Sequence, residues 1–179
     1  MNKIIYVLVA ALALIGCQKR DQGTTASIPQ ERREMGRKLV LKSLQDLENK
    51  DLTGAISTLE ASIKVDPVDA EAYLLLGQIL LKVGEYERAT AFLDQTAKNF
   101  PDNGTAYYML SVANKMSGKK LPAVLAARRS AEIFQQAQDK DNMLKAAVLL
   151  QDLINTPDAD FVPAKKPATP QIEAAPYKN

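Results

Sequence analysis

The chain has 179 residues, of which 46% are hydrophobic, 6% are aromatic and none is tryptophan. This composition suits helices packed through Leu, Ala and Val better than a β-sandwich, and the length allows one domain or a short solenoid. The formal charge is only +2 and histidine is absent, so we expect neither nucleic-acid binding nor histidine-based acid-base or metal chemistry.

Residues 1–16 are predicted to be a signal segment. Lys3 gives the segment a positive start, and an uninterrupted apolar run follows from Ile4 to Ile15. A helix needs about 20 residues to cross the roughly 30 Å hydrocarbon core of a bilayer. The shorter run therefore indicates a signal peptide rather than a membrane span.

The residues around the end of this segment, Leu14-Ile15-Gly16-Cys17, resemble the lipobox of bacterial lipoproteins. The resemblance implies that the chain is cut before Cys17 and that the Cys17 thiol is acylated, which would anchor the protein to a membrane. Gln18 follows in place of Asp, and in Gram-negative lipoproteins this implies the periplasmic side of the outer membrane. The other interpretation is that Cys17 is a bystander thiol in an ordinary signal peptide.

Residues 17–30 are predicted to be the lipidated Cys and a flexible, polar tether, and residues 31–155 a helical domain. Pro67 and Pro101 should end helices, and Asp69 and Asn103 should cap the helices that follow. The predicted helices are about Glu31 to Asn49, Leu52 to Val65, Ala70 to Val83, Tyr86 to Asn99, Gly104 to Met116, Pro122 to Ala137 and Asp141 to Ile154.

A fixed period runs through the helical domain. Like residues recur one period apart in the pairs Pro67 and Pro101, Tyr73 and Tyr107, and Gly84 and Gly118. Together with the Leu76-Gly77 pair and Ala89, this period resembles the tetratricopeptide repeat, in which each unit of about 34 residues is two helices joined by a turn. The resemblance implies an all-α solenoid of helical hairpins, with about three repeats and a C-terminal capping helix.

The three units match the repeat pattern to different degrees. Residues 70–103 match it closely, and residues 104–137 match it except that Gln135 replaces the terminal Pro, so a different bend is expected there. In the first unit, about residues 36–69, Lys42 and Ser43 replace the Leu-Gly pair. The first helix of that unit is therefore expected to be divergent or shifted by one residue.

The last segment, residues 156–179, holds five of the nine prolines. Such a segment cannot bury a core and is predicted to be disordered. It is interpreted either as an inert tail or as a tail that binds a partner.

The sequence offers no catalytic constellation, since it has no histidine and its one cysteine is predicted to be lipidated. We predict no enzyme, no cofactor, no metal site and no small-molecule substrate. The acidic pairs Asp139 with Asp141 and Glu85 with Glu87 are interpreted as helix-end electrostatics. A basic cluster on the third unit is interpreted as a solvated face or as a site for lipid or an acidic partner: Lys119, Lys120, Arg128 and Arg129.

The family resemblance implies that the first helix of each unit lines a concave groove. Helix 70–83 is hydrophobic nearly all round, so it should be buried on both sides. The residues predicted to contact a protein or peptide partner are Leu74, Gln78, Leu81, Tyr108, Met109, Val112 and Met116. The Lys and Asn clamp of family members that bind acidic C-termini is missing. The groove should therefore receive an apolar segment of a partner, or be filled by the N-terminal helix or the capping helix.

These features predict a lipid-anchored scaffold for protein interactions in the bacterial envelope. The chain is similar in kind to the repeat-bearing lipoproteins that help assemble outer-membrane machines, such as type IV pilus secretins, so a role in a secretion or pilus complex is expected. The alternative is a structural lipoprotein with an internally filled groove, which acts through self-association or cell-wall contact.

Overall fold

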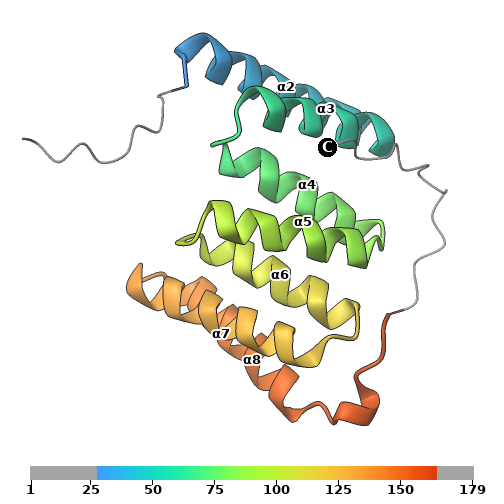
Figure 1. Ribbon diagram of the computed structural model, residues 1–179, viewed down its shortest axis with the longest axis vertical. Helices are drawn as coiled ribbons and strands as arrows, with labels where there is room; N and C mark the ends of the chain where they lie inside the picture. The colour runs from blue at the N-terminus through green and yellow to red at the C-terminus, as the bar shows by residue number, and fades with distance from the viewer. Residues whose placement is uncertain (1–27, 165–179) are drawn as a thin grey trace, which may run out of the picture.

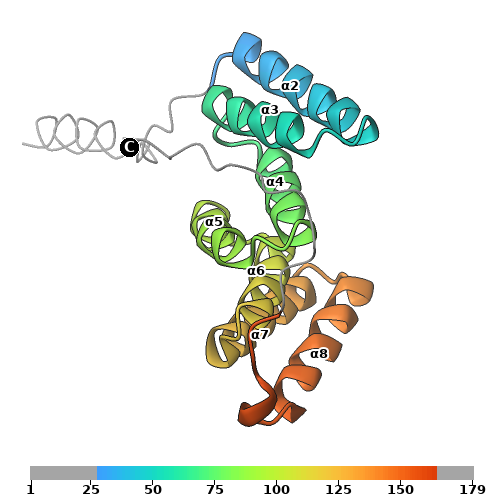
Figure 2. The ribbon, with the colours of Figure 1, turned by 90° about the vertical axis from the view of Figure 1, so that its right-hand side faces the viewer.

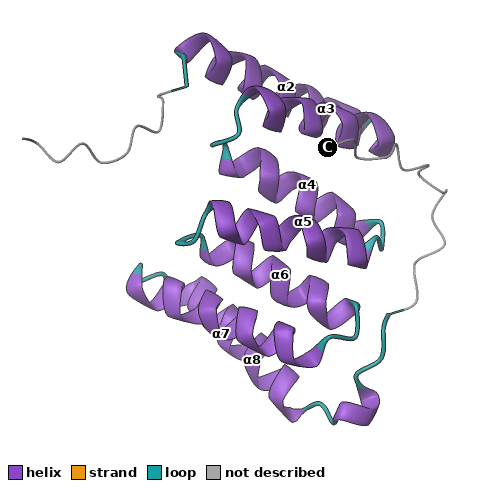
Figure 3. Cartoon of the chain, in the orientation of Figure 1, coloured by secondary structure: helices purple, strands orange, loops and turns teal. Residues whose placement is uncertain are grey.

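The described part of the chain is built from α-helices. The structure is a computed structural model that describes residues 28–164, so the predicted signal segment, Cys17 and nearly all of the tether lie outside the described residues. Within residues 28–164 there is no β-strand (Figure 3). The elements are α2 (Gln30–Glu48), α3 (Leu52–Val65), α4 (Ala70–Lys82), α5 (Tyr86–Asn99), α6 (Gly104–Met116), α7 (Lys120–Gln136), α8 (Lys140–Asn155) and the 3-10 helix η1 (Asp158–Asp160).

The helices form consecutive hairpins that stack in chain order (Figures 1 and 2). α2 packs on α3, α4 on α5 and α6 on α7, and α8 packs on α7 to close the array. The α2–α3 hairpin lies at one end of the stack and α8 at the other (Figure 1). The predicted all-α solenoid of helical hairpins with a capping helix is confirmed.

The helix limits agree with the prediction to within two residues, because the capping residues were identifiable. The Asp69 carboxylate accepts the Glu71 amide at 3.0 Å, and the Asn103 side chain accepts the Ala106 amide at 3.0 Å. α7 begins at Lys120, two residues before the predicted start at Pro122. Pro122 still lies in the first turn, where its missing N–H removes no helical hydrogen bond.

The turn inside each hairpin recurs at the same position of the repeat unit. Gly84 and Gly118 adopt left-handed φ values of 77° and 71°, and Lys50, which lies one repeat period before Gly84, has φ 62°. Glycine takes this conformation without steric cost, whereas lysine does so with strain. The first hairpin therefore has the same turn as the others, although no glycine marks it.

The first unit is in register with the other two. Ser43, Gly77 and Ser111 occupy the same position in successive units, and all three are buried. Lys42, beside Ser43, is exposed. The expected shift by one residue does not occur, so the first helix is divergent only in its residue types.

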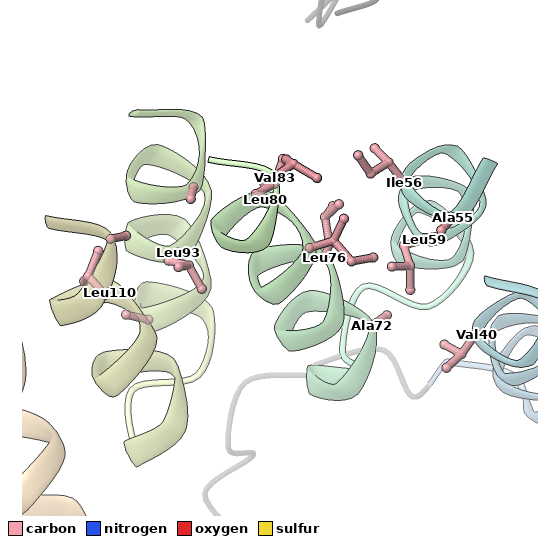
Figure 4. Packing of buried hydrophobic residues seen from close by; sticks show 14 of the residues in the cluster. Val40, Ala55, Ile56, Leu59, Ala72, Leu76, Leu80, Val83, Leu93 and Leu110 are labelled. Atoms are coloured by element: carbon pink, nitrogen blue, oxygen red, sulfur yellow. The ribbon is translucent and has the colours of Figure 1, made fainter. Parts of the chain in front are cut away.

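The core follows the same period across the hairpins (Figure 4). Ala55, Ala89 and Ala123 are fully buried at equivalent positions, where each second helix approaches its neighbours. Leu59 and Leu93 are also fully buried and belong to the cluster that joins α3, α4, α5 and α6. A second cluster, around Ala123, Ala127 and Leu153, holds α8 against α7.

Residues 156–164, which follow α8, are folded, whereas disorder was predicted for the whole of residues 156–179. Phe161 packs on the second cluster, between α7 and α8. The Lys120 ammonium bonds the Thr156 carbonyl and lies 2.7 Å from the Asp158 carboxylate. The Ala164 amide donates to the Met116 carbonyl at 2.8 Å. The folded region therefore extends beyond residue 155, and residues 165–179 lie outside the described residues.

No helix between residues 28 and 164 combines the length and the apolar character that a membrane span requires.

Candidate partner-binding groove

A groove of about 640 Å³ is lined by residues of α4, α6, α7 and α8. Six of the seven residues predicted to contact a partner line it: Leu74, Gln78, Leu81, Tyr108, Met109 and Val112. Leu75, which follows Leu74 on α4, lines the groove as well. The repeat register therefore brings the predicted residues of α4 and α6 together on one surface.

The apolar lining falls into two groups. Leu75, Leu81 and Met109 pack with one side against the main core and form the floor of the groove. Leu74, Tyr108 and Val112 are half-buried but are not among the residues that pack on that core. The second group is available for contact, and its replacement should leave the fold intact.

Polar side chains stand around this apolar surface. Glu71 and Gln78 of α4, together with Thr105 of α6, are exposed and line the groove. On α8, the Lys145 ammonium donates to the Asn142 side-chain oxygen at 3.0 Å, and both residues line the groove. A few polar groups around an apolar surface can set the orientation of a bound segment.

Met116 is not brought into the groove. It ends α6 and is half-buried, and its carbonyl accepts the Ala164 amide. The predicted contact through Met116 is therefore not part of the groove of α4 and α6. The folded segment after α8 reaches this end of α6.

Sequence reasoning missed the contribution of the last two helices. Phe134 of α7 and Asn142 and Lys145 of α8 line the groove. Asp139 caps α8 as Asn103 caps α6. The distance in sequence between these two caps is two residues longer than the repeat period. A search that allowed this longer spacing would have aligned Lys145 with Met109 as a groove position.

The described residues leave the groove open, although internal filling was one of the two expectations. No residue of α2 lines it, and α8 supplies only Asn142 and Lys145 at one side. Within residues 28–164, neither the first helix nor the capping helix fills the groove.

The basic cluster of the third unit is partly used within the fold. Lys120 is bound by Thr156 and Asp158, as described above. The Arg129 guanidinium lies 3.6 Å from Glu132 and stacks over the Tyr107 ring at 6.0 Å. Lys119 and Arg128 remain exposed.

The acidic pair Asp139 and Asp141 lies at the start of α8. The side chain and the backbone N–H of Asn142 both donate to the Asp139 carboxylate, and these hydrogen bonds lower the pKa of Asp139 below its ordinary value. Asp139 is therefore a helix cap. Among the described residues, no group of three or more His, Cys, Asp and Glu side chains could hold a metal ion.

Comparison with known proteins supports the repeat resemblance. The tetratricopeptide repeat family model matches residues 46–112, which run from the end of α2 into α6. No curated protein matches the sequence.

Similar solved structures include the TPR2B domain of yeast Sti1 in its complex with pHsp70, with a TM-score of 0.61 and 17% identity over 69% of this chain and 97% of that chain. PcrH from Pseudomonas aeruginosa has a TM-score of 0.62 and 16% identity over 68% of this chain and 92% of that chain. PcrH in complex with the chaperone binding region of PopD has a TM-score of 0.62 and 15% identity over the same shares. At these identities the likeness concerns the fold alone.

Proposed function

We propose that the protein is a lipid-anchored scaffold of the bacterial envelope that binds an apolar segment of a partner protein in the groove of α4 and α6. The observation that carries this proposal is the groove itself, which is large, lined by apolar side chains and open among the described residues. A helix that is apolar on two sides needs cover on both, and the core covers only one side of α4.

The groove chemistry favours apolar side chains over an acidic terminus as the ligand. Leu74, Tyr108 and Val112 offer a surface on which a leucine, methionine or aromatic side chain could pack. Among the described residues that line the groove, Lys145 is the one cation, and Glu71 stands in the same lining. Without a second cation, a carboxylate would lack the paired donors that usually hold it.

Two structural neighbours are consistent with this use of the fold. The Sti1 domain is seen with pHsp70, and PcrH is seen with the chaperone binding region of PopD. Both are complexes with a protein or peptide. We propose the same kind of partner here and no catalytic activity. We also propose a role in assembling an outer-membrane, secretion or pilus complex, because the chain is similar in kind to the repeat-bearing lipoproteins that help assemble such complexes.

Groove binding should depend on side chains that the fold does not need. We expect the double variant Leu74→Glu and Tyr108→Glu to weaken binding of an envelope partner by about a hundredfold, since each residue buried at the centre of an interface contributes roughly 1–3 kcal/mol. The measurement is a crosslinked pull-down with Cys17 intact, using a photoreactive residue at position 78, followed by titration of the captured protein.

The matched control is Leu125→Glu. Leu125 of α7 is 55% exposed and is not among the groove residues, so this variant should bind as the parent does. Circular dichroism should show unchanged helix content in both variants. Equal binding by the double variant and the parent would refute the groove as the partner site, and its unfolding would show that Leu74 and Tyr108 belong to the core.

The lipid anchor is a separate part of the proposal and rests on the residues around Cys17. We expect cells given labelled palmitate to label the parent chain and not Cys17→Ser, because acylation requires the thiol. The parent should fractionate with the outer membrane if the host is Gram-negative. Label retained by Cys17→Ser would contradict lipidation at this residue.

A further inference from the structure

The described chain stops beside one end of the groove. The Ala164 amide donates to the Met116 carbonyl at 2.8 Å, where α6 ends (Figure 1). Pro163 packs on the Gly118 turn, since a Cβ atom added at Gly118 would lie 2.8 Å from the Pro163 Cδ atom. Met116 comes one helical turn after Val112, which lines the groove. The chain therefore leaves the described fold about one turn of α6 beyond the groove lining.

Residues 165–179, the tail segment, are long enough to reach along the groove. Their prolines leave no proline-free run longer than residues 171–175, which is too short for a stable helix, so we expect an extended chain of about 3.1 Å per residue. Ile172 follows Ala164 by eight residues and would reach about 25 Å. The side of α6 from Thr105 to the end of the helix is only about 16 Å long. The tail segment can therefore reach the far end of the groove.

The tail segment also has apolar side chains that suit the groove. Ile172 and Tyr177 are its large apolar residues, and its prolines can pack on an aromatic ring such as that of Tyr108. Residues 18–27, the other part of the predicted mature chain outside the described residues, have Ala26 as their one apolar side chain. They also lead to α2, which lies at the end of the stack opposite to α8 (Figure 1). Of the two segments, the tail segment is therefore the one that fits an apolar groove.

Charged residues of the tail segment match those of the groove in sign and in order. Lys145 of α8 and Glu71 of α4 line the groove, and neither forms an ion pair among the described residues. Glu71 lies in the first turn of α4, at the end of the groove furthest from the exit of the chain, and the repeat register places Lys145 one turn nearer to that exit. Glu173 and Lys178 each directly follow one of the two large apolar residues. A chain that enters from the exit thus brings Glu173 toward Lys145 and then Lys178 toward Glu71.

We propose that the tail segment occupies the groove of its own chain, with Ile172 and Tyr177 packed on the apolar lining, until a partner displaces it. The inference rests on the proposed function, because it concerns regulation of the same groove. A tethered segment has an effective concentration of about 1 mM. A contact with a Kd of only about 0.1 mM would then keep about ten grooves closed for each open one, and would raise the apparent Kd of the partner about tenfold.

The absence of tryptophan from the chain makes Tyr108→Trp a probe of the groove. The protein is the predicted mature chain with Cys17→Ser, so that no acyl chain, lipid or detergent is present to enter the groove. We expect blue-shifted emission from the full chain, and the emission of a more solvated indole from the same chain ending at Ala164. A synthetic peptide of residues 165–179 at about 1 mM, tenfold above the Kd given above, should restore the blue shift in the shortened chain.

Replacing Ile172 and Tyr177 by Glu should give the full chain the emission of the shortened one. Thr169→Glu with Asn179→Glu is the matched control, because it adds the same charge without removing a large apolar side chain, and it should keep the emission of the full chain. Leu125→Trp, at a position 55% exposed on α7 and outside the groove, should report no difference between the two lengths. Circular dichroism should show the same amount of helix in both.

Equal emission from the groove probe at the two lengths, or a shortened chain that ignores the peptide, would overturn the proposal. A blue shift that grows with protein concentration would overturn it too, and would assign the groove to the tail segment of a second copy. Partner binding is measured separately, and the shortened chain should bind the captured partner about tenfold more tightly than the full chain. Tail-dependent emission without any partner binding would refute the proposed function and leave this inference intact.

Discussion

Gly77→Leu is expected to lower the free energy of unfolding by about 3 kcal/mol, near the upper end for overpacked cores. A Cβ atom at Gly77 would lie 2.5 Å from the Leu93 Cδ2 atom and 3.1 Å from its Cγ atom. Leu93 is fully buried, so it has little room to yield. The Met109 methyl, 3.4 Å from the same point, closes the space on the side of α6. Chemical denaturation followed by circular dichroism measures the loss.

Two further variants separate overpacking from a general effect of leucine. Ala147 is exposed on α8, so Ala147→Leu should change stability by less than about 0.5 kcal/mol. Gly77→Ala combined with Leu93→Ala should cost less than the sum of the two changes, because the added methyl enters the space that Leu93 vacates. An unchanged denaturation midpoint for Gly77→Leu would mean that α4 and α5 do not meet at Gly77, and the repeat alignment would then be wrong.

The fold was predictable because its main constraints depend on residue size and on helix breakers. Ala55, Ala89 and Ala123 recur where helices touch, and Pro67 and Pro101 recur where one hairpin ends. Only small side chains permit the first kind of contact, and proline ends the preceding helix. These rules act locally, so the sequence displays them directly.

Other periodic features were not predictable, since several residue types can satisfy them. Ser62, Thr96 and Ser130 occupy one position in successive units and are fully buried. The Ser62 hydroxyl donates to the Gly36 carbonyl at 3.0 Å, and the Ser130 hydroxyl donates to the Gly104 carbonyl at 2.8 Å. A buried hydroxyl needs such a partner, and for Ser62 and Ser130 the partner lies on another helix. The Thr96 hydroxyl instead donates to the Phe92 carbonyl of its own helix at 2.9 Å. Hydroxyl residues are common on helix surfaces, so their period does not stand out in the sequence.

The candidate groove was half predictable for a related reason. Its α4 and α6 residues follow from the repeat register, whereas Phe134, Asn142 and Lys145 depend on how the last helices dock. Residues 156–164 were mispredicted because the prolines of residues 156–179 indicate disorder. The contacts that fold them join residues far apart in sequence: Lys120 with Asp158, and Met116 with Ala164. Composition carries no information about contacts of this kind.

The capping helix depends on one side chain more than on any other. Leu153 of α8 is fully buried against Ala123 and Ala127 of α7, with Phe161 beside it. Leu153→Ala should cost about 3 kcal/mol through lost burial and the cavity that remains. A solenoid unit contacts only its neighbours, so the loss should appear as local opening of α8 and of residues 156–164.

Native-state hydrogen exchange distinguishes local from global loss. In Leu153→Ala, amide protection should fall in α8 and at Phe161, while α4 and α5 keep the protection of the parent. Ile154→Ala is the control, because Ile154 is 51% exposed and its truncation should leave exchange unchanged. Equal loss of protection in α4 would show that the array unfolds as one unit. Local loss should also weaken partner binding, because Asn142 and Lys145 would leave the groove together with α8.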